Sequence, residues 1–296
     1  MSLMVRYVDQ NSLLAKTKLV QLIHVDATDC SAKRLVEEFE KALEKKAISL
    51  EQLIGLACDN ASVMVGKYNS FKTHLIKRLS HLMTLPCICH SLALIAKEAC
   101  SAIPEEIQSF ISKIPTFINS SPKRLANFNI FQRPFEDHPS KLLRFASTRW
   151  LSRQIAITRI LDNWENLRIF STDQVVEKVA SAVDLLAIMN NPMTKVYLLF
   201  LKFAIDPLEK TNAHFQGSAT LVHQLQPSSK KLLIDVLQKF MKPALLKPEI
   251  IDNEARNIDF GSITNQRDAL KVDVGDDCKD YLQAELSSEV SESIID

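Results

Sequence analysis

The spacing of apolar residues at the start of the chain predicts two strands joined by a turn. Residues 3–8 form a β-rich run, residues 9–12 (Asp-Gln-Asn-Ser) have turn composition, and residues 18–25 form a second apolar run. Two such runs on either side of a turn predict an antiparallel hairpin.

The next segment predicts helices that alternate with short buried strands. A helix is expected over residues 32–46, where Leu35, Phe39 and Leu43 recur at helical spacing. The bounded apolar run 53–57 predicts a buried strand, a helix follows from 66 to 82, and the stretch 82–90 leads into a helix over 91–100. The order β-β-α-β-α-β-α predicts an α/β sheet with mixed strand directions.

Helical periodicity dominates after Ala102, which makes the chain helix-rich overall. Three apolar stripes predict helices that face a core, and the pair Asp206-Pro207 predicts the start of a new helix. The stripes are Ile157, Ile160, Leu161, Trp164 and Leu167; Met193, Val196, Tyr197, Phe200 and Phe203; and Leu232, Leu233, Val236, Leu237 and Phe240.

Past Pro243 the helical pattern weakens, and the last twelve residues, 285–296, are acidic and rich in serine. They are expected to form a frayed helix or a disordered end. The chain therefore divides into an α/β region over residues 1–102, a helical region over 103–245, and an acidic, linker-like or partly disordered tail over 246–296.

Composition narrows the class of protein. The 296 residues are 46% hydrophobic and 24% charged, which is typical of a globular chain. The sequence has neither an apolar run long enough to predict a membrane span nor the architecture of a signal peptide. The six cysteines lie in apolar surroundings, which favours reduced thiols in the cytosol or nucleus over a disulfide framework.

The net charge of +1 says nothing of a nucleic-acid partner, but its distribution is uneven. Acids dominate from 249 to 296, whereas residues 122–159 are basic. This distribution has two interpretations. The basic segment forms a polyanion-binding face and the acidic segment a solvated terminus, or both are ordinary solvent-exposed surfaces. The cations of the basic segment are Lys123, Arg124, Arg133, Lys141, Arg144, Arg149, Arg153 and Arg159.

Asp59 is the first candidate site residue, because it follows a predicted buried strand directly. Open α/β sheets bind ligands beyond the carboxyl ends of their strands, and a carboxylate there suits a divalent metal. The sequence "DNAS" is equally good turn and cap chemistry. Gly66-Lys67 does not complete a phosphate-binding loop, since Ala61 stands where the first glycine belongs and Tyr68 where Ser or Thr would bind magnesium.

Cys87 and His90 have the C-x-x-H spacing of a zinc knuckle. A structural zinc site needs four ligands, and no second pair stands nearby. A packed Cys–His pair at a strand-to-helix junction is therefore favoured, with the imidazole orienting a neighbouring group.

A third candidate combines cations, hydroxyls and an indole in "ASTRWLSR". Arg149, Trp150 and Arg153 suit a surface that grips phosphates and stacks on a base, and Lys123 and Arg124 add charge to it. The same residues also suit a helix N-terminus in which Trp150 is a core anchor.

Taken in order, five blocks resemble the hAT superfamily of transposases, most closely its domesticated, zinc-finger-associated members. They are "RYVDQNS", "LIGLACDNASVMVGK", "CICHSLALI", "STRWLSR" and "FAIDPLEKTNAHFQG", and the resemblance covers Met1 to Pro243.

The resemblance implies a ribonuclease-H-like fold interrupted by a long helical insertion. It also implies DDE chemistry, in which two aspartates and a glutamate hold two metal ions that activate water for phosphodiester cleavage. By resemblance, the second aspartate falls on Asp59, the C-x-x-H pair on Cys87 and His90, and the Arg-Trp motif on Arg149 and Trp150.

Departures from the family pattern set the functional expectation. The strand with the first aspartate would precede Met1, which leaves the predicted sheet incomplete. The glutamate cannot be placed, and neither the dimerisation region nor a BED-type zinc finger is recognisable. Since one carboxylate does not make a two-metal site, we expect a truncated, catalytically inactive transposase-like protein with no cofactor. Mg²⁺ or Mn²⁺ would bind Asp59 only if the site were completed from elsewhere.

The expected partners are DNA, another protein or a second copy, in the nucleus, with no membrane and no small-molecule substrate. Two alternatives stay open. One is part of an active metal-dependent transposase whose missing acids lie outside this chain. The other is a helical protein-interaction module with no nucleic-acid role.

Overall fold

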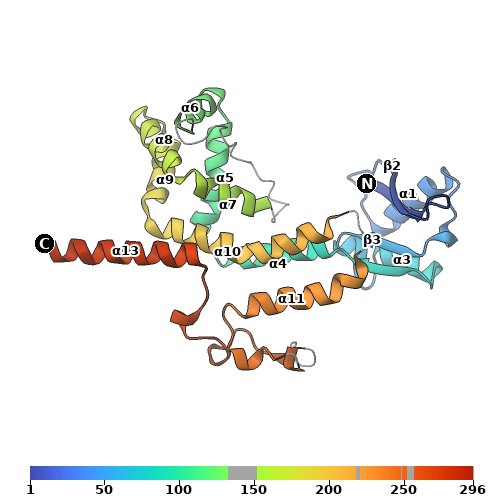
Figure 1. The fold of residues 1–296 in the computed structure, drawn as a ribbon. Helices are drawn as coiled ribbons and strands as arrows, with labels where there is room; N and C mark the ends of the chain where they lie inside the picture. Colours follow the sequence, from blue (N-terminus) through green and yellow to red (C-terminus); the bar gives the residue numbers. More distant parts are fainter. Residues whose placement is uncertain (133–151, 218–220, 248, 252–256, 296) are drawn as a thin grey trace. The chain divides into compact units, whose positions relative to one another are not determined.

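The fold is helix-rich with two small sheets, as the computed structural model shows (Figure 1). The structure describes residues 1–132, 152–217, 221–247, 249–251 and 257–295. The chain forms two compact units, Met1–Ser91 and Leu92–Asp296. The boundary lies within helix α4 (Ile88–Ser101), so it precedes the position near residue 102 where the sequence changes character.

The first unit begins with the expected antiparallel hairpin. Strands β1 (Ser2–Val8) and β2 (Ala15–Leu22) pair so that Val8 faces Ala15. The Asp9 carboxylate closes the turn, because it accepts hydrogen bonds from the Ser12 N–H and hydroxyl at 2.9 and 2.8 Å. Lys16 adds an ion pair to Asp9 at 2.9 Å. These contacts start the second strand three residues earlier than its apolar run predicted.

Helices supply most of the core of this unit. In α1 (Ala32–Glu44), the Ser31 hydroxyl caps the first turn, and the predicted stripe of Leu35, Phe39 and Leu43 is buried. The Phe39 ring meets Phe71 of α3 (Phe71–Arg78) edge-on, with 5.2 Å between ring centroids. The buried members of the cluster are Leu3, Ile23, Leu35, Val36, Phe39, Ala42, Leu43, Phe71, Leu75, Leu79 and Leu82.

The second pair of strands is parallel. Strands β3 (Gly55–Cys58) and β4 (Met83–Pro86) are joined through α2 (Ser62–Val65) and α3. One helix was expected over 66–82, and the structure has the shorter α3 within that range, because Ser70 and Thr73 form a capping box that starts it. Helix α2 ends at Val65, before the expected range. A 3₁₀ turn, η1 (Leu50–Gln52), precedes β3.

The prediction of one mixed sheet is wrong for the described strands, which form two separate two-stranded sheets. Strand β1 forms hydrogen bonds with β2, and β3 forms hydrogen bonds with β4. The apolar faces of α1 and α3 close over Leu3, Ile23 and Leu82, so helices cover the core where a continuous sheet was expected.

The second unit is a helical assembly around its own core. Helix α8 (Trp164–Val176) packs on α9 (Ala180–Asn190), and α10 (Pro192–Phe215) packs on α7 (Ser152–Asp162). Both α11 (Leu225–Leu237) and α13 (Asp276–Ile295) pack on α10. Residues of the predicted stripe, Ile157, Ile160 and Leu167, have no exposed surface, and Phe170 gathers Phe117, Phe128 and Phe131 around its ring. The described residues also include α5 (Glu105–Asn119) and α6 (Pro122–Gln132). The 3₁₀ turns are η2 (Val222–Gln224), η3 (Pro243–Leu245), η5 (Ile263–Asn265) and η6 (Ala269–Lys271).

The expected helix start at Asp206-Pro207 is wrong, because Pro207 lies inside α10. That helix begins instead at Pro192, where the Asn191 side chain accepts the Met193 N–H at 3.0 Å. Ile205 and Leu208 are both buried, so packing continues on either side of the proline and outweighs the one hydrogen bond it removes.

Of the two expectations for the acidic end, the helical one is what the structure shows, since α13 (Asp276–Ile295) extends over it. Its first turns are fixed to α10 by a small cluster in which Cys278 is buried against Val196 and Leu199. Packing of this kind stabilises a helix whose charged sequence alone predicts little structure.

Candidate metal and nucleic-acid sites

Asp59 lies one residue beyond β3 and is exposed to solvent. Its Oδ1 accepts the backbone N–H of Ala61 at 3.1 Å, at the residue that precedes the first turn of α2. The structure therefore places Asp59 at the carboxyl end of a strand, as the sequence predicted. The same contact with Ala61 is the one expected if Asp59 only forms a turn.

Asn60 was not singled out by the sequence, yet its side chain joins the ends of β3 and β4. Its Oδ1 accepts the Cys87 N–H at 3.1 Å, and its Nδ2 donates to Cys87 O at 3.2 Å and to Ser91 Oγ at 2.8 Å. The signal was present as a polar side chain directly after the apolar run 53–57. The prediction that this run forms a buried strand is wrong, because no residue of β3 is buried. Its partners lie 27 and 31 residues away, so spacing could not reveal them.

Three thiols gather around this junction. Burial raises the pKa of Cys58, and the nearby charges of Asp59 and Cys87 raise it further. Burial likewise raises the pKa of Cys89, with a contribution from Cys87. Protonated thiols of this kind are poor metal ligands and weak nucleophiles. Cys87 and His90 both lie at the start of α4, half-buried, where the Ser91 N–H donates to Cys87 O at 3.0 Å.

The donors around Asp59 do not fit a pair of magnesium ions. Magnesium prefers hard oxygen ligands in an octahedral shell, whereas the neighbouring side chains are thiols and an amide oxygen already bound to Cys87. Among the described residues, no group of three His, Cys, Asp or Glu side chains is arranged to hold a metal ion.

The predicted nucleic-acid residues have different surroundings. Arg149 and Trp150 lie outside the described residues. Lys123 is exposed near the start of α6. Arg124 lies over the Phe117 ring, with its guanidinium carbon 4.4 Å from the ring centroid, and donates to Ser120 Oγ at 2.8 Å. Between the two described cations of α6, Lys123 presents its charge more openly.

Arg153 differs from its expected role, because only 7% of it is exposed. It lies beside Cys100 at the start of α7, and burial lowers the pKa of its guanidinium. Burial raises the pKa of the Cys100 thiol, which Arg153 partly opposes. A side chain enclosed in this way is a packing element of the helical core and does not present its charge to a phosphate.

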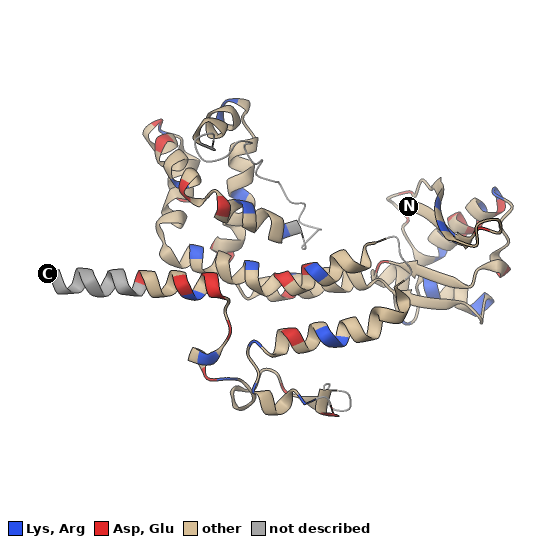
Figure 2. Ribbon diagram, in the orientation of Figure 1, with Lys and Arg blue, Asp and Glu red and all other residues tan. Residues whose placement is uncertain are grey.

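Charges of both signs occur along α10, α11 and α13, as Figure 2 shows. Helix α11 carries Lys230, Lys231 and Asp235, and the first turns of α13 carry Asp277 and Lys279. The basic segment, residues 122–159, includes α6 and most of α7. Residues 133–151, which lie between these helices, are not among the described residues.

No protein-family model matches the chain, and no solved structure matches it. Among the described helices, none has both the length and the apolar character needed to cross a membrane.

Proposed function

We propose that this chain is a hAT-transposase-derived protein of the nucleus that binds DNA without cutting it. The ordered sequence blocks from "RYVDQNS" to "FAIDPLEKTNAHFQG" support the origin. The observation that carries the absence of cutting is the contact of Asp59 with the Ala61 N–H, which gives the family's catalytic position a structural task.

The donor chemistry around Asp59 supports the same proposal. Cleavage by the family's mechanism needs two metal ions held by several carboxylates. Here the adjacent amide, Asn60, uses its oxygen to accept the Cys87 N–H, and the thiols of Cys58 and Cys89 are held protonated by burial. These groups stabilise a strand-to-helix junction, and hard cations prefer other ligands.

A cleavage assay tests the catalytic half of the proposal. The purified chain is incubated with DNA that carries hAT terminal inverted repeats, in the presence of Mg²⁺ or Mn²⁺. We expect no nicking above the level of an Asp59→Asn control. Cleavage that requires metal and disappears in Asp59→Asn would favour the alternative of an active transposase completed by residues outside this chain.

A binding assay tests the DNA half. The affinity for duplex DNA is measured between about 50 and 200 mM salt, where each neutralised phosphate contributes a slope of about −0.9. We expect Lys123→Ala and Arg149→Ala each to flatten the slope by about one unit. Arg168→Ala is the matched control, because Arg168 lies on α8 in an exposed pair with Glu165.

A protein partner is the competing outcome. The helical unit buries an extensive core of its own, and such assemblies serve as docking surfaces. Absence of salt-dependent DNA binding, together with capture of a protein partner that tolerates Lys123→Ala and Arg149→Ala, would replace the DNA-binding proposal with a protein-interaction module.

A further inference from the structure

A stretch of the first unit without acidic residues presents lysines to solvent. Residues 60–91 contain no aspartate and no glutamate. The cations of this stretch are Lys67, Lys72, Lys77 and Arg78. Arg78 forms an ion pair with Glu40 of α1, whereas within the part of the chain that the structure describes no carboxylate forms an ion pair with the three lysines. The stretch therefore keeps a net positive charge in the folded unit.

Tyr68 is the most exposed large apolar side chain of this stretch, with a relative accessibility of 81%. Tyrosine usually packs its ring and leaves only the hydroxyl in solvent, so an exposed ring of this kind is available to a ligand. The ammonium of Lys67 lies 5.3 Å from the centroid of the ring. An aromatic surface and a positive charge therefore lie next to each other on the first unit.

Hydrogen bonds hold the backbone around Tyr68 in place. Residues 66–70, which we call the Tyr68 loop, connect α2 to α3. The Ser70 hydroxyl donates to Gly66 O at 2.7 Å and thereby joins the two ends of the loop. Asn69 Oδ1 and His74 Nε2 form a hydrogen bond at 2.8 Å, which fixes the loop to α3. A loop held in this way loses little conformational entropy when a ligand binds to it.

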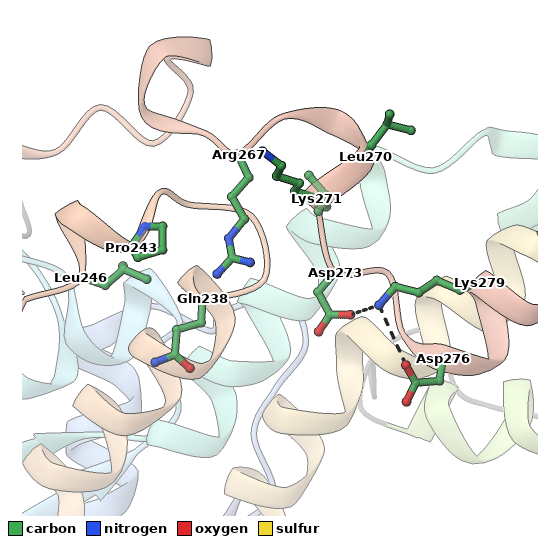
Figure 3. A pocket seen from close by; sticks show the side chains of 10 residues that line it. Gln238, Pro243, Leu246, Arg267, Leu270, Lys271, Asp273, Asp276 and Lys279 are labelled. Carbon is green, nitrogen blue, oxygen red and sulfur yellow. Dashed lines mark hydrogen bonds and ion pairs between the residues drawn. The ribbon is translucent and has the colours of Figure 1, made fainter.

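The cleft of the second unit has different chemistry, although lysines line it as well (Figure 3). Lys279 contacts Asp273 at 3.0 Å and Asp276 at 3.9 Å there. No aromatic side chain is among the described residues that line this cleft. Its carboxylates would repel a phosphate, so the Tyr68 loop suits a nucleic acid better than the cleft does.

We infer that the Tyr68 loop binds single-stranded nucleic acid, with an unpaired base stacked on the Tyr68 ring and the adjacent phosphates near Lys67 and Lys72. Proteins that hold single strands combine aromatic rings, on which bases stack, with cations that contact the backbone. Unpaired bases expose the faces that such a ring needs. This inference does not depend on the duplex binding proposed above, because Lys123 and Arg149 come after residue 91 in the chain.

Fluorescence anisotropy of the full chain with labelled strands tests the inference. The probes are dT and U oligomers of about 12 nucleotides, and an oligomer of the same length that has the phosphates but only abasic sites. We expect a strand with bases to bind about tenfold or more tightly than the abasic strand. Tighter binding of the dT or of the U oligomer identifies the strand as DNA or RNA. Equal binding of strands with and without bases would overturn the inference.

Variants of the exposed ring test whether Tyr68 supplies the stacking surface. Tyr68→Leu removes the aromatic ring and should weaken binding of the dT oligomer about tenfold, whereas Tyr68→Phe should bind as the parent chain does. Both substitutions change an exposed side chain, so the fold should be kept. Unchanged affinity for the dT oligomer in Tyr68→Leu would overturn the inference.

A second pair of variants tests the charge. Lys67→Gln should weaken the dT oligomer and the abasic oligomer alike, because the phosphates are common to both. Lys33→Gln, at an exposed position of α1, is the matched control for the loss of one positive charge and should have little effect. Equal losses in Lys33→Gln and Lys67→Gln would overturn the placement of the phosphates.

Duplex binding is measured in parallel, so that the two proposals can fail separately. Tyr68→Leu should leave the affinity for duplex DNA unchanged, because the bases of a duplex are stacked on one another. A parent chain that binds single strands through Tyr68 but no duplex would support this inference and contradict only the duplex binding proposed above.

Discussion

The side-chain amide of Asn60 pairs with the backbone of Cys87 in the way that a neighbouring strand residue would. It accepts the Cys87 N–H at 3.1 Å and donates to Cys87 O at 3.2 Å. The backbone ladder ends at the pair Cys58 and Pro86, and proline has no N–H to extend it. Asn60 thus continues the pairing by one step and fixes the start of α4 to the end of β3.

Replacing Asn60 with aspartate should therefore weaken the first unit. Asn60→Asp keeps an acceptor for the Cys87 N–H but loses the donor and places a carboxylate against Cys87 O. We expect a loss of about 1 to 3 kcal/mol, seen as faster amide hydrogen exchange at Cys87. Asn257→Asp, at an exposed position, is the control. Unaltered exchange at Cys87 would show that the amide contacts contribute little.

Asp59 should bind divalent metal only weakly. A single exposed carboxylate that already accepts the Ala61 N–H offers an incomplete shell, so we expect an affinity for Mn²⁺ weaker than about 1 mM. Paramagnetic broadening of NMR signals around Asp59 measures it, and Asp59→Asn should remove the effect. Binding of two Mn²⁺ ions at micromolar concentration would contradict the proposed loss of cleavage activity.

Arg153 and Lys123 should respond in opposite ways to alanine substitution. Arg153 is buried beside Cys100, so Arg153→Ala should lower the free energy of unfolding by about 2 to 4 kcal/mol through lost packing. Lys123 is exposed, so Lys123→Ala should change stability by less than about 0.5 kcal/mol. Urea unfolding followed by Trp164 fluorescence checks both. Equal stability of the two variants would argue against burial of Arg153.

The Asp9 carboxyl should titrate unusually low. The hydrogen bond from Lys16, followed by those from Ser12, lowers the pKa of Asp9 to about 2 from 3.8. Because the folded pKa is depressed, the stabilisation of the hairpin turn is complete above pH 3.8 and is lost as the pH falls through about 2. A carboxyl-carbon NMR titration should give that midpoint.

Lys16→Met provides the matching test of cause. This substitution should move the pKa of Asp9 back toward 3.8. The pKa of Asp26 is lowered by hydrogen bonds from Thr28 and should not change. If the pKa of Asp9 is the same in Lys16→Met as in the parent chain, Lys16 is not the cause of the shift and the hydrogen bonds from Ser12 would account for it.

Gly275 should tolerate no side chain. Its φ of +88° is strained for other residues, and an added Cβ would lie 2.7 Å from Cγ of Phe203. We expect Gly275→Ala to destabilise the second unit by about 2 to 4 kcal/mol, measured by thermal unfolding. At Gly217 the nearest atom to an added Cβ is 3.6 Å away, so Gly217→Ala should be nearly neutral. Similar losses at both glycines would exclude the contact with Phe203 as the cause.

The sequence predicted correctly those strands and helices that are determined by residues close together in the chain. The hairpin followed from apolar runs around the turn at Asp9, and the buried stripe of Ile157, Ile160 and Leu167 followed from helical spacing. Pro207 misled the prediction, because proline usually starts a helix, whereas here packing of Ile205 and Leu208 continues α10 through it.

The site could be predicted only in part. The position of Asp59 at a strand end was evident from the order of residues. The roles of Asn60 and Arg153 were not, because each is set by partners distant in the chain, Cys87 for the amide and Cys100 for the guanidinium. The sequence does not show whether the charged group of an arginine or lysine lies in solvent or in the protein core.

The order of residues alone was enough to predict the strands, most helices and the helix-rich character, and it contains the blocks on which the proposed origin depends. The separation of the described strands into two sheets and the burial of Arg153 became known only from the folded chain. The reason is physical: secondary structure follows from neighbours along the chain, whereas burial, charge pairing and the availability of a side chain depend on residues that folding brings together from afar.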